Sequence, residues 1–261
     1  MQECIHGLEV PLCDICYPKA VVEKPKVARV STPRAPRVAG VSTSRKSINV
    51  GEQRVYHVTH IRNLELILES GAILPDSELF GEESHPVAVD LSTALTRELR
   101  RTVEVPAGRI ADIDGSPVTV PGAAVSGYVP FFLSPTPTLW DDLRRGAGDE
   151  TRWSAAARSA AFTDFVFLVT TVKALGSSTV IADGDAAGAT TLFAAGESIG
   201  TMLQRLHGSD AALEAEALVP GSVPIEAIQL IGVANDRVRE RVRALTSTKV
   251  AVYPPWFQPV E

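Results

Sequence analysis

The chain has 261 residues, of which 45% are hydrophobic, and a formal net charge of −6. This size and composition suit a globular protein of one large or two small domains, and the charge excludes a uniformly basic nucleic-acid-binding protein. No run approaches the ~18 apolar residues of a membrane helix, and the first residues lack the apolar segment of a signal peptide. We therefore expect a cytoplasmic protein with no membrane segment.

All three cysteines lie within the first sixteen residues, in the stretch CIHGLEVPLCDIC. Cys13 and Cys16 form a C-x-x-C pair, and Cys4 with His6 forms C-x-H, so that three thiolates and one imidazole make a complete tetrahedral zinc set. A redox pair or unstructured thiols would also fit this spacing. We predict a zinc knuckle over residues 1–17, which the metal would have to fold because so short a segment buries no core.

The next segment, residues 18–50, is a proline-rich and basic linker. From residue 17 to residue 50 there are eight lysines and arginines and one glutamate, which leaves residues 51–261 with a net charge of −10. The segment shows no amphipathic period, so we expect a flexible chain. A basic arm joined to an acidic domain is typical of a protein that binds a polyanion, although a solvated tether fits the composition equally well.

Residues 51–261 are predicted to form one domain of mixed strands and short helices. RVYHVTH, residues 54–60, has the β-branched and aromatic content of a strand, and IRNLELILES has the apolar spacing of a helix that ends at Gly71. Residues 93–105 are expected to begin as a helix and to end as an extended segment. Residues 127–140 are expected to form a strand followed by a proline-rich loop. A buried strand is expected within 162–175.

The last part of the domain continues this mixture. STVIADGDAAGATTLF is typical of a strand that enters a loop, and ESIGTMLQRLHG of an amphipathic helix. Residues 215–235 predict a strand, a turn, a helical turn begun by Pro224 and another strand, and a surface helix and a final strand follow at 236–245 and 249–257. No regular βαβ repeat is present, so we expect an α+β fold with a largely antiparallel or split sheet.

Few residues of this domain can carry chemistry. It contains no cysteine, and the motifs of phosphate-binding loops, zinc metalloproteases and α/β-hydrolases are absent from its sequence. A histidine, an arginine and a glutamate from distant segments can converge in a cleft, but each also fits a structural role in the core or on the surface. The candidates are His57, Thr59, His60, Arg97, Arg100, Arg101, Glu214 and Glu216.

Three segments, in this order, resemble the DarT-type DNA ADP-ribosyltransferases: VYHVTHIRNLELILESGAIL, GYVPFFLSP and AEALVPGSVPIEAIQLIGV. The resemblance covers about residues 54–256. It implies an ADP-ribosyltransferase-like fold, in which the cleft of a split β-sheet holds NAD. It also implies the transfer of ADP-ribose to a thymine or guanine base of single-stranded DNA, usually by a toxin that is paired with a macrodomain antitoxin.

The resemblance also assigns the two catalytic residues. Glu216, in AEALV, matches the catalytic glutamate of the family. Arg100, at the start of RRTVEV, matches the catalytic arginine, with Arg101 and Arg97 as the alternative registers.

For NAD binding, the resemblance implies that His57 and Thr59 lie against the nicotinamide end and its ribose, and that Asn63 lies near the cleft. The loop from about residue 186 to residue 212 would recognise the substrate. Aromatic side chains can stack on an exposed base, and the candidates for this contact are Phe131, Phe132, Trp140 and Trp153.

The sequence departs from the family pattern at two positions near these segments. Thr136 stands where family members usually have an arginine, and Asp185 stands where a TDGHA-like stretch has a histidine. Both departures bear on the acceptor base more than on the reaction.

Two other functions remain open. A transferase of the same fold could modify RNA, although phosphate capture needs more basic residues than this acidic domain offers. A non-catalytic nucleic-acid-binding protein could use the knuckle and the arm alone. Labelled NAD with DNA and RNA oligonucleotides would separate these functions.

If Cys4, His6, Cys13 and Cys16 bind zinc, elemental analysis of the purified protein should find about one zinc per chain. A chelator should then weaken the affinity for single-stranded DNA, because the knuckle unfolds without its metal. Replacing Cys13 and Cys16 with serine should abolish the bound zinc. Metal-free protein with unchanged DNA affinity would contradict this site.

Overall fold

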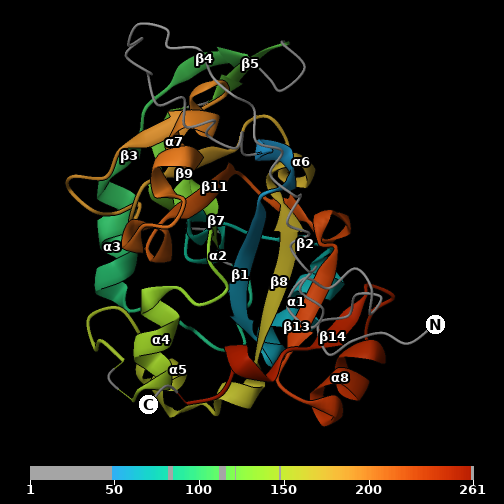
Figure 1. Ribbon diagram of the computed structural model, residues 1–261. Helices are drawn as coiled ribbons and strands as arrows, with labels where there is room; N and C mark the ends of the chain where they lie inside the picture. The colour runs from blue at the N-terminus through green and yellow to red at the C-terminus, as the bar shows by residue number, and fades with distance from the viewer. Residues whose placement is uncertain (1–48, 82–84, 112–115, 121, 147, 260–261) are drawn as a thin grey trace, which may run out of the picture. The chain divides into compact units, whose positions relative to one another are not determined.

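The computed structural model describes residues 49–81, 85–111, 116–120, 122–146 and 148–259, all within one compact unit, Ser47–Glu261 (Figure 1). The predicted zinc ligands and nearly all of the basic linker lie outside the described residues. Within the described ranges, no helix has both the length and the apolar character of a membrane span.

The domain is built on an eight-stranded sheet with the order β10-β9-β11-β7-β1-β8-β13-β14. All neighbouring strands pair antiparallel except β13 and β14, which are parallel. The predicted α+β fold is therefore confirmed. The strands are β1 (Arg54–His60), β7 (Tyr128–Phe132), β8 (Phe165–Thr171), β9 (Val180–Ala182), β10 (Phe193–Ala195), β11 (Glu216–Pro220), β13 (Leu230–Val233) and β14 (Val250–Val252).

The sheet is split between β1 and β7. β1 pairs with β8 along its whole length, and β7 pairs with β11 along its whole length, whereas β1 and β7 share the single registered pair Tyr56–Phe132. Pro130, in the middle of β7, has no N–H to donate to a neighbouring strand. The His57 ring instead joins the strands, because its Nδ1 lies 2.9 Å from the carbonyl oxygen of Pro130. The two halves of the sheet thus separate beside β1.

Short helices and strand pairs surround the sheet (Figure 1). In the figure, α3, α4 and α5 lie on the left side of the domain and α8 on the right. The helices are α1 (Ile61–Ser70), α2 (Asp76–Leu79), α3 (Ala94–Thr102), α4 (Thr138–Arg144), α5 (Ala155–Ser159), α6 (Val172–Leu175), α7 (Ser198–Leu206) and α8 (Asp236–Arg243). The strand pairs are β2 (Ala72–Ile73) with β12 (Val223–Pro224), β3 (Glu104–Val105) with β6 (Ala123–Ala124), and β4 (Gly108–Ala111) with β5 (Pro117–Val120).

The passage from β1 into α1 follows the prediction from sequence. His60 is the N-cap of the helix, and its Nδ1 accepts the backbone N–H of Arg62 at 3.2 Å. Its ring also packs edge-on against Phe165, with 5.7 Å between ring centroids. The helix ends at Gly71, whose φ of 76° is left-handed and favours glycine. His60 is therefore a structural residue, whereas His57 on the same strand is turned toward the split.

The core confirms the predicted alternation along β8. Val166 and Leu168 belong to the cluster that α1 and α7 cover, and Phe165 and Phe167 belong to an aromatic cluster on the opposite face. Trp140 lies in the centre of this aromatic cluster, and its Nε1 donates to the carbonyl oxygen of Trp256 at 2.6 Å. The alternation places a separate core on each face of the sheet.

The predicted stacking role of two aromatic residues is wrong. Phe131 and Trp140 have no exposed surface, so neither can present a ring face to a base. Trp153 is 6% exposed but lines a cavity beside the split, so its stacking role stays a prediction. Large aromatic side chains gain more by filling the core of a domain than by lying open to solvent. Phe132, the fourth candidate, is half-buried and remains available.

Gly232 in β13 lies directly against the indole of Trp256. A Cβ at this position would lie 2.7 Å from Cζ3 of Trp256, whose ring is held by a stack on Tyr253 and an edge contact with Tyr56. We expect Gly232→Ala to lower the free energy of unfolding by ~1–3 kcal/mol, measured by chemical denaturation, because the core cannot accept the extra carbon without a shift.

Gly200→Ala is the matched control, because Gly200 lies inside α7 and its added Cβ would meet Val50 at an ordinary 3.5 Å. Alanine favours a helix over glycine, so this variant should be neutral or more stable by up to about 1 kcal/mol. Equal destabilisation by the two substitutions would contradict the packing described for β13.

Candidate active site

A cavity of about 550 Å³ opens where the sheet splits. Its walls come from β1, α1, residues 72–80 and 85–92, α3, β7 and the start of β11. A cavity of this volume, mostly apolar with a few polar groups, is typical of a binding site for a small molecule. All five residues that the resemblance assigns to catalysis and NAD binding line it: His57, Thr59, Asn63, Arg100 and Glu216.

Arg100 and Glu216 form a buried ion pair on one wall of the cavity. Arg100 comes from the last turn of α3 and Glu216 is the first residue of β11. Nη1 and Nη2 of Arg100 lie 3.3 Å and 3.4 Å from Oε2 of Glu216, and the two residues are 8% and 3% exposed. Asp76 at the start of α2 adds a second carboxylate, 3.9 Å from Nε of Arg100. The guanidinium is therefore held from two sides.

The structure distinguishes the three candidate arginines on α3. Arg97 Nη1 donates to both carboxylate oxygens of Asp90 at 2.7 Å. Arg101 is exposed and pairs with Glu98 on the same helix. Of the three, Arg100 is the one that reaches Glu216, which favours the register that the resemblance gave.

Burial and neighbouring charges act on Glu216 in opposite directions. Burial is the largest influence and raises the pKa of this carboxyl group above its ordinary value. The guanidinium of Arg100 lowers the pKa, the carboxylate of Asp185 raises it, and the N–H of Ala186 lowers it by donating to the carboxylate. The result is a raised pKa, as is common for carboxyl groups of active sites.

Arg100 remains a cation. Burial alone would lower its pKa, but the carboxylates of Glu216, Asp76 and Asp185 outweigh burial and raise the pKa above its ordinary value. The wall of the cavity therefore carries a permanent positive charge beside a carboxylate.

His57 and Thr59 alternate with Val58 on β1 and face the cavity. His57 Nδ1 carries the hydrogen that bonds to the carbonyl oxygen of Pro130, because a carbonyl can only accept. Burial lowers the pKa of His57, against smaller raising effects of that carbonyl and of Asp76. The ring is therefore neutral at pH 7, and its Nε2 is a hydrogen-bond acceptor.

Asn63 binds the neighbouring chain segment with its side chain. Its Nδ2 donates to the carbonyl oxygen of Val89 at 2.7 Å, and its Oδ1 accepts the N–H of Val89 at 2.8 Å. The amide thus ties α1 to the segment that forms the opposite wall of the cavity. A direct contact of Asn63 with NAD stays a prediction.

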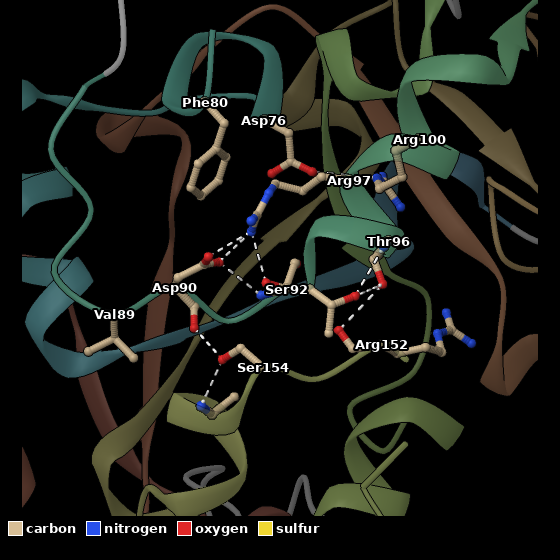
Figure 2. Close-up of polar contacts among 12 residues, drawn as sticks. Asp76, Phe80, Val89, Asp90, Ser92, Thr96, Arg97, Arg100, Arg152 and Ser154 are labelled. Carbon is tan, nitrogen blue, oxygen red and sulfur yellow. Dashed lines mark hydrogen bonds and ion pairs between the residues drawn. The ribbon is translucent and has the colours of Figure 1, made fainter. Parts of the chain in front are cut away.

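A polar clasp fastens this wall to α3, and Figure 2 shows it. Asp90 binds Arg97 and the N–H of Ser92, and its carbonyl oxygen accepts the hydroxyl of Ser154 at 2.5 Å. The guanidinium of Arg97 also lies 4.2 Å from the ring centroid of Phe80, a cation–π distance. Sequence analysis missed Asp90 and Phe80 because no motif marks them.

A second ion pair lies on the other side of Glu216. Nη2 of Arg152 is 2.8 Å from Oδ2 of Asp185, and both side chains are about one-third exposed. The pair lines the main cavity and also a smaller cavity of about 140 Å³, which reaches Glu216 as well. Asp185, the position at which the resemblance led us to expect a histidine, therefore lines both cavities.

The segment predicted as a substrate-recognition loop is only partly a loop. Residues 186–212 contain β10 and most of their second half is α7, whose apolar face is buried. Asp185 and Ala187, in the connection between β9 and β10, do line the main cavity. Within the described ranges no cluster of three or more histidine, cysteine or acidic residues is arranged to hold a metal.

Comparison with known proteins agrees with this geometry. The family model described as "ssDNA thymidine ADP-ribosyltransferase, DarT" matches residues 56–258. No curated protein matches the chain.

Solved structures share the fold at low sequence identity. The DarT of Thermus sp. 2.9 with ADP-ribosylated ssDNA is 21% identical, with a TM-score of 0.62, and the match covers 78% of this chain and 96% of that one. The same protein with NAD+ gives 20% identity, a TM-score of 0.59 and coverage of 78% and 97%. The DarTG of Thermosipho africanus with ADP-ribose is 18% identical, with a TM-score of 0.54, and the match covers 78% of this chain and 51% of that one.

The family model spans almost all of the described domain, including the split sheet and residues that line the cavity. The chain belongs to the DarT family of single-stranded DNA thymidine ADP-ribosyltransferases.

Proposed function

We propose that Glu216 and Arg100 carry out the reaction of the family in this chain, the transfer of ADP-ribose from NAD+ to a thymine base of single-stranded DNA. The observation that carries this assignment is the buried ion pair at 3.3 Å on the wall of a cavity large enough for a small-molecule ligand. Residues of opposite charge that are 116 positions apart meet here with almost no exposure to solvent. Ionised residues are rarely buried without a functional or structural demand.

Glu216 would act first on the donor. Breaking the bond between nicotinamide and ribose builds positive charge on the sugar, and a fixed carboxylate beside the ribose 2′-hydroxyl stabilises that charge. Arg100 holds the carboxylate in one orientation, so that little reorganisation accompanies the reaction. His57 and Thr59, on the β1 wall of the same cavity, would orient the nicotinamide end and its ribose.

Glu216 would then act on the acceptor. A thymine ring nitrogen forms the new bond to the ribose and loses its proton, and nicotinamide leaves with the bonding electrons. The raised pKa of Glu216 suits it to accept this proton. Arg100, a permanent cation, stabilises the negative charge that the base develops.

The acceptor is a single strand because the reacting nitrogen lies on the pairing edge of thymine. A duplex hides this edge, whereas a single strand presents it without the cost of extruding the base. The Thermus structures, which hold NAD+ in one case and ADP-ribosylated ssDNA in another, support this donor and this acceptor. Half-buried Phe132, which lines both cavities, and Trp153, which lines the main one, are the remaining candidates for stacking on the base.

We also propose that the enzyme is a toxin with a macrodomain antitoxin as its partner. The similarity to Thermosipho africanus DarTG, in which the match covers about half of the longer chain, supports this pairing. The zinc knuckle and the basic arm would add affinity for DNA, and both stay predictions.

Glu216→Gln tests the central assignment. The amide keeps the shape of the side chain but removes its charge, so the transfer of label from NAD to a single-stranded oligonucleotide should fall by roughly 10²–10³-fold or more. Glu226→Gln, at an exposed position of the 3-10 turn Ile225–Ala227, is the matched control and should retain activity. Thermal melting should verify that both variants fold, because loss of one partner of a buried pair destabilises a protein.

Mass spectrometry of oligonucleotides that contain one reactive base type tests the acceptor. We expect modification on thymine, and little modification of the same oligonucleotide in a duplex. Modification of guanine would change the assigned base, and label on RNA alone would favour an RNA-modifying transferase.

Arg97→Ala tests the clasp. Loss of the bonds to Asp90 should free the wall at residues 85–92 and raise the KM for NAD by on the order of tenfold, as expected for one charge-assisted hydrogen bond. The kcat should change less, because Arg97 does not contact Glu216. Arg241→Ala breaks an exposed ion pair of the same length with Glu65 and should leave both constants unchanged. A lower kcat at constant KM in Arg97→Ala would argue against a role in shaping the cavity wall.

A further inference from the structure

The connection between β9 and β10 forms a tight turn that begins at Asp185. Oδ1 of Asp185 accepts the N–H of Ala187 at 3.0 Å, and its carbonyl oxygen accepts the N–H of Gly188 at 2.8 Å and the hydroxyl of Thr191 at 2.5 Å. A side-chain oxygen that accepts the amide two residues later closes a turn of defined shape. The Asp185 side chain therefore sets the path of the next residues.

This turn contacts Glu216 through its backbone. Ala186 lies between Asp185 and Ala187, whose N–H the Asp185 side chain binds. Ala186 is fully buried, and its own N–H donates to the Glu216 carboxylate. Asp185 itself lines both cavities beside Glu216 and binds Arg152 at 2.8 Å. One residue thus fixes a hydrogen-bond donor to Glu216 and also places a negative charge near it.

We propose that Asp185 is a positioning residue for Glu216, and that Asp185 and Arg152 form an opposed pair of charges on the wall of the two cavities that Glu216 shares. The inference rests on the proposed role of Glu216 and adds to it. Asp185 directs the Ala186 N–H at the carboxylate and disfavours its ionised form by repulsion. Arg152, bound to Asp185, offsets part of that repulsion.

Other charged groups face Glu216 from each neighbouring element. Arg100 on α3 bonds to it directly, and Asp76 on α2 holds Arg100. His57 on β1 shares the main cavity, and its ring is neutral. The smaller cavity adds three acidic residues near Glu216, from α4, from the segment before Trp153 and from the residue pair before β11: Asp142, Asp149 and Glu214. None of these groups changes in the experiment below, so the shifts between variants belong to Asp185 and Arg152.

The test compares Asp185→Asn with Arg152→Gln in the full chain. Asparagine keeps an oxygen that accepts the Ala187 N–H, so the turn should persist while the charge is lost. The acidic limb of the kcat–pH profile should then move to lower pH, by on the order of one pH unit, because repulsion no longer disfavours the ionised Glu216. Arg152→Gln removes the offsetting cation, so the same limb should move to higher pH.

Asp185→Ala removes both the charge and the oxygen that closes the turn. It should shift the limb in the direction of Asp185→Asn and also lower kcat at the optimum pH, because the Ala186 N–H is no longer directed. Loss of packing alone would not move Asp185→Asn and Arg152→Gln in opposite directions. If Glu216→Gln is inactive and neither limb moves, or if both limbs move in the same direction, the proposal is overturned.

An NMR titration of the ¹³C-labelled Glu216 carboxyl group gives a readout that does not need activity. The midpoint should fall in Asp185→Asn and rise in Arg152→Gln relative to the unsubstituted protein. Opposite midpoint shifts together with an active Glu216→Gln variant would leave this inference intact and refute the catalytic role of Glu216. Unmoved midpoints together with an inactive Glu216→Gln variant would refute this inference and support the catalytic role of Glu216.

Discussion

The ion pair between Arg100 and Glu216 is the constraint on which the rest of the site depends. Burying two charges costs several kcal/mol per ion, and their attraction offsets this cost only when the geometry is maintained. The pair joins α3 to β11, two elements that are far apart in the sequence, across the opening in the sheet. The surrounding contacts can be understood as the means of maintaining that geometry. Asp76 holds the guanidinium, the clasp of Asp90 and Arg97 holds the helix, and in our proposal the turn at Asp185 orients the carboxylate.

The split in the sheet makes room for this pair without loss of the two cores. Full pairing of β1 with β7 would close the space in which the cavity lies. Pro130 lacks the N–H that such pairing needs, and its carbonyl oxygen binds the His57 side chain instead of a backbone N–H. β1 and β7 nevertheless keep full pairing with their other neighbours, β8 and β11. The aromatic cluster around Trp140 and the aliphatic cluster around Leu168 then anchor the two faces of the sheet. A rigid frame with one local opening is suited to holding reacting groups in fixed positions.

The amino-acid sequence by itself determined the local elements. Three local features appear in the structure as predicted: the apolar alternation of residues 165–169, the helical spacing of residues 61–70 and the end of that helix at Gly71. They were predictable because each depends on residues close in sequence and on which faces of the element are buried. The segment resemblance identified the family and the residues that line the cavity. The sequence did not distinguish core tryptophans from surface ones, since burial depends on how the elements pack. For that reason Trp140, which is fully buried, was wrongly included among the candidates for stacking on DNA.

Only the tertiary structure decided which charges meet. On α3, three arginines of identical chemistry follow each other within five residues, and their roles differ because the helix turns each toward a different partner. No sequence pattern indicates which aspartates pair with the arginines of the site, so these contacts follow from the fold alone. These aspartates are Asp76, Asp90 and Asp185. Sequence patterns report periodicity along the chain, whereas electrostatic coupling depends on distances through space between segments that are far apart in the sequence.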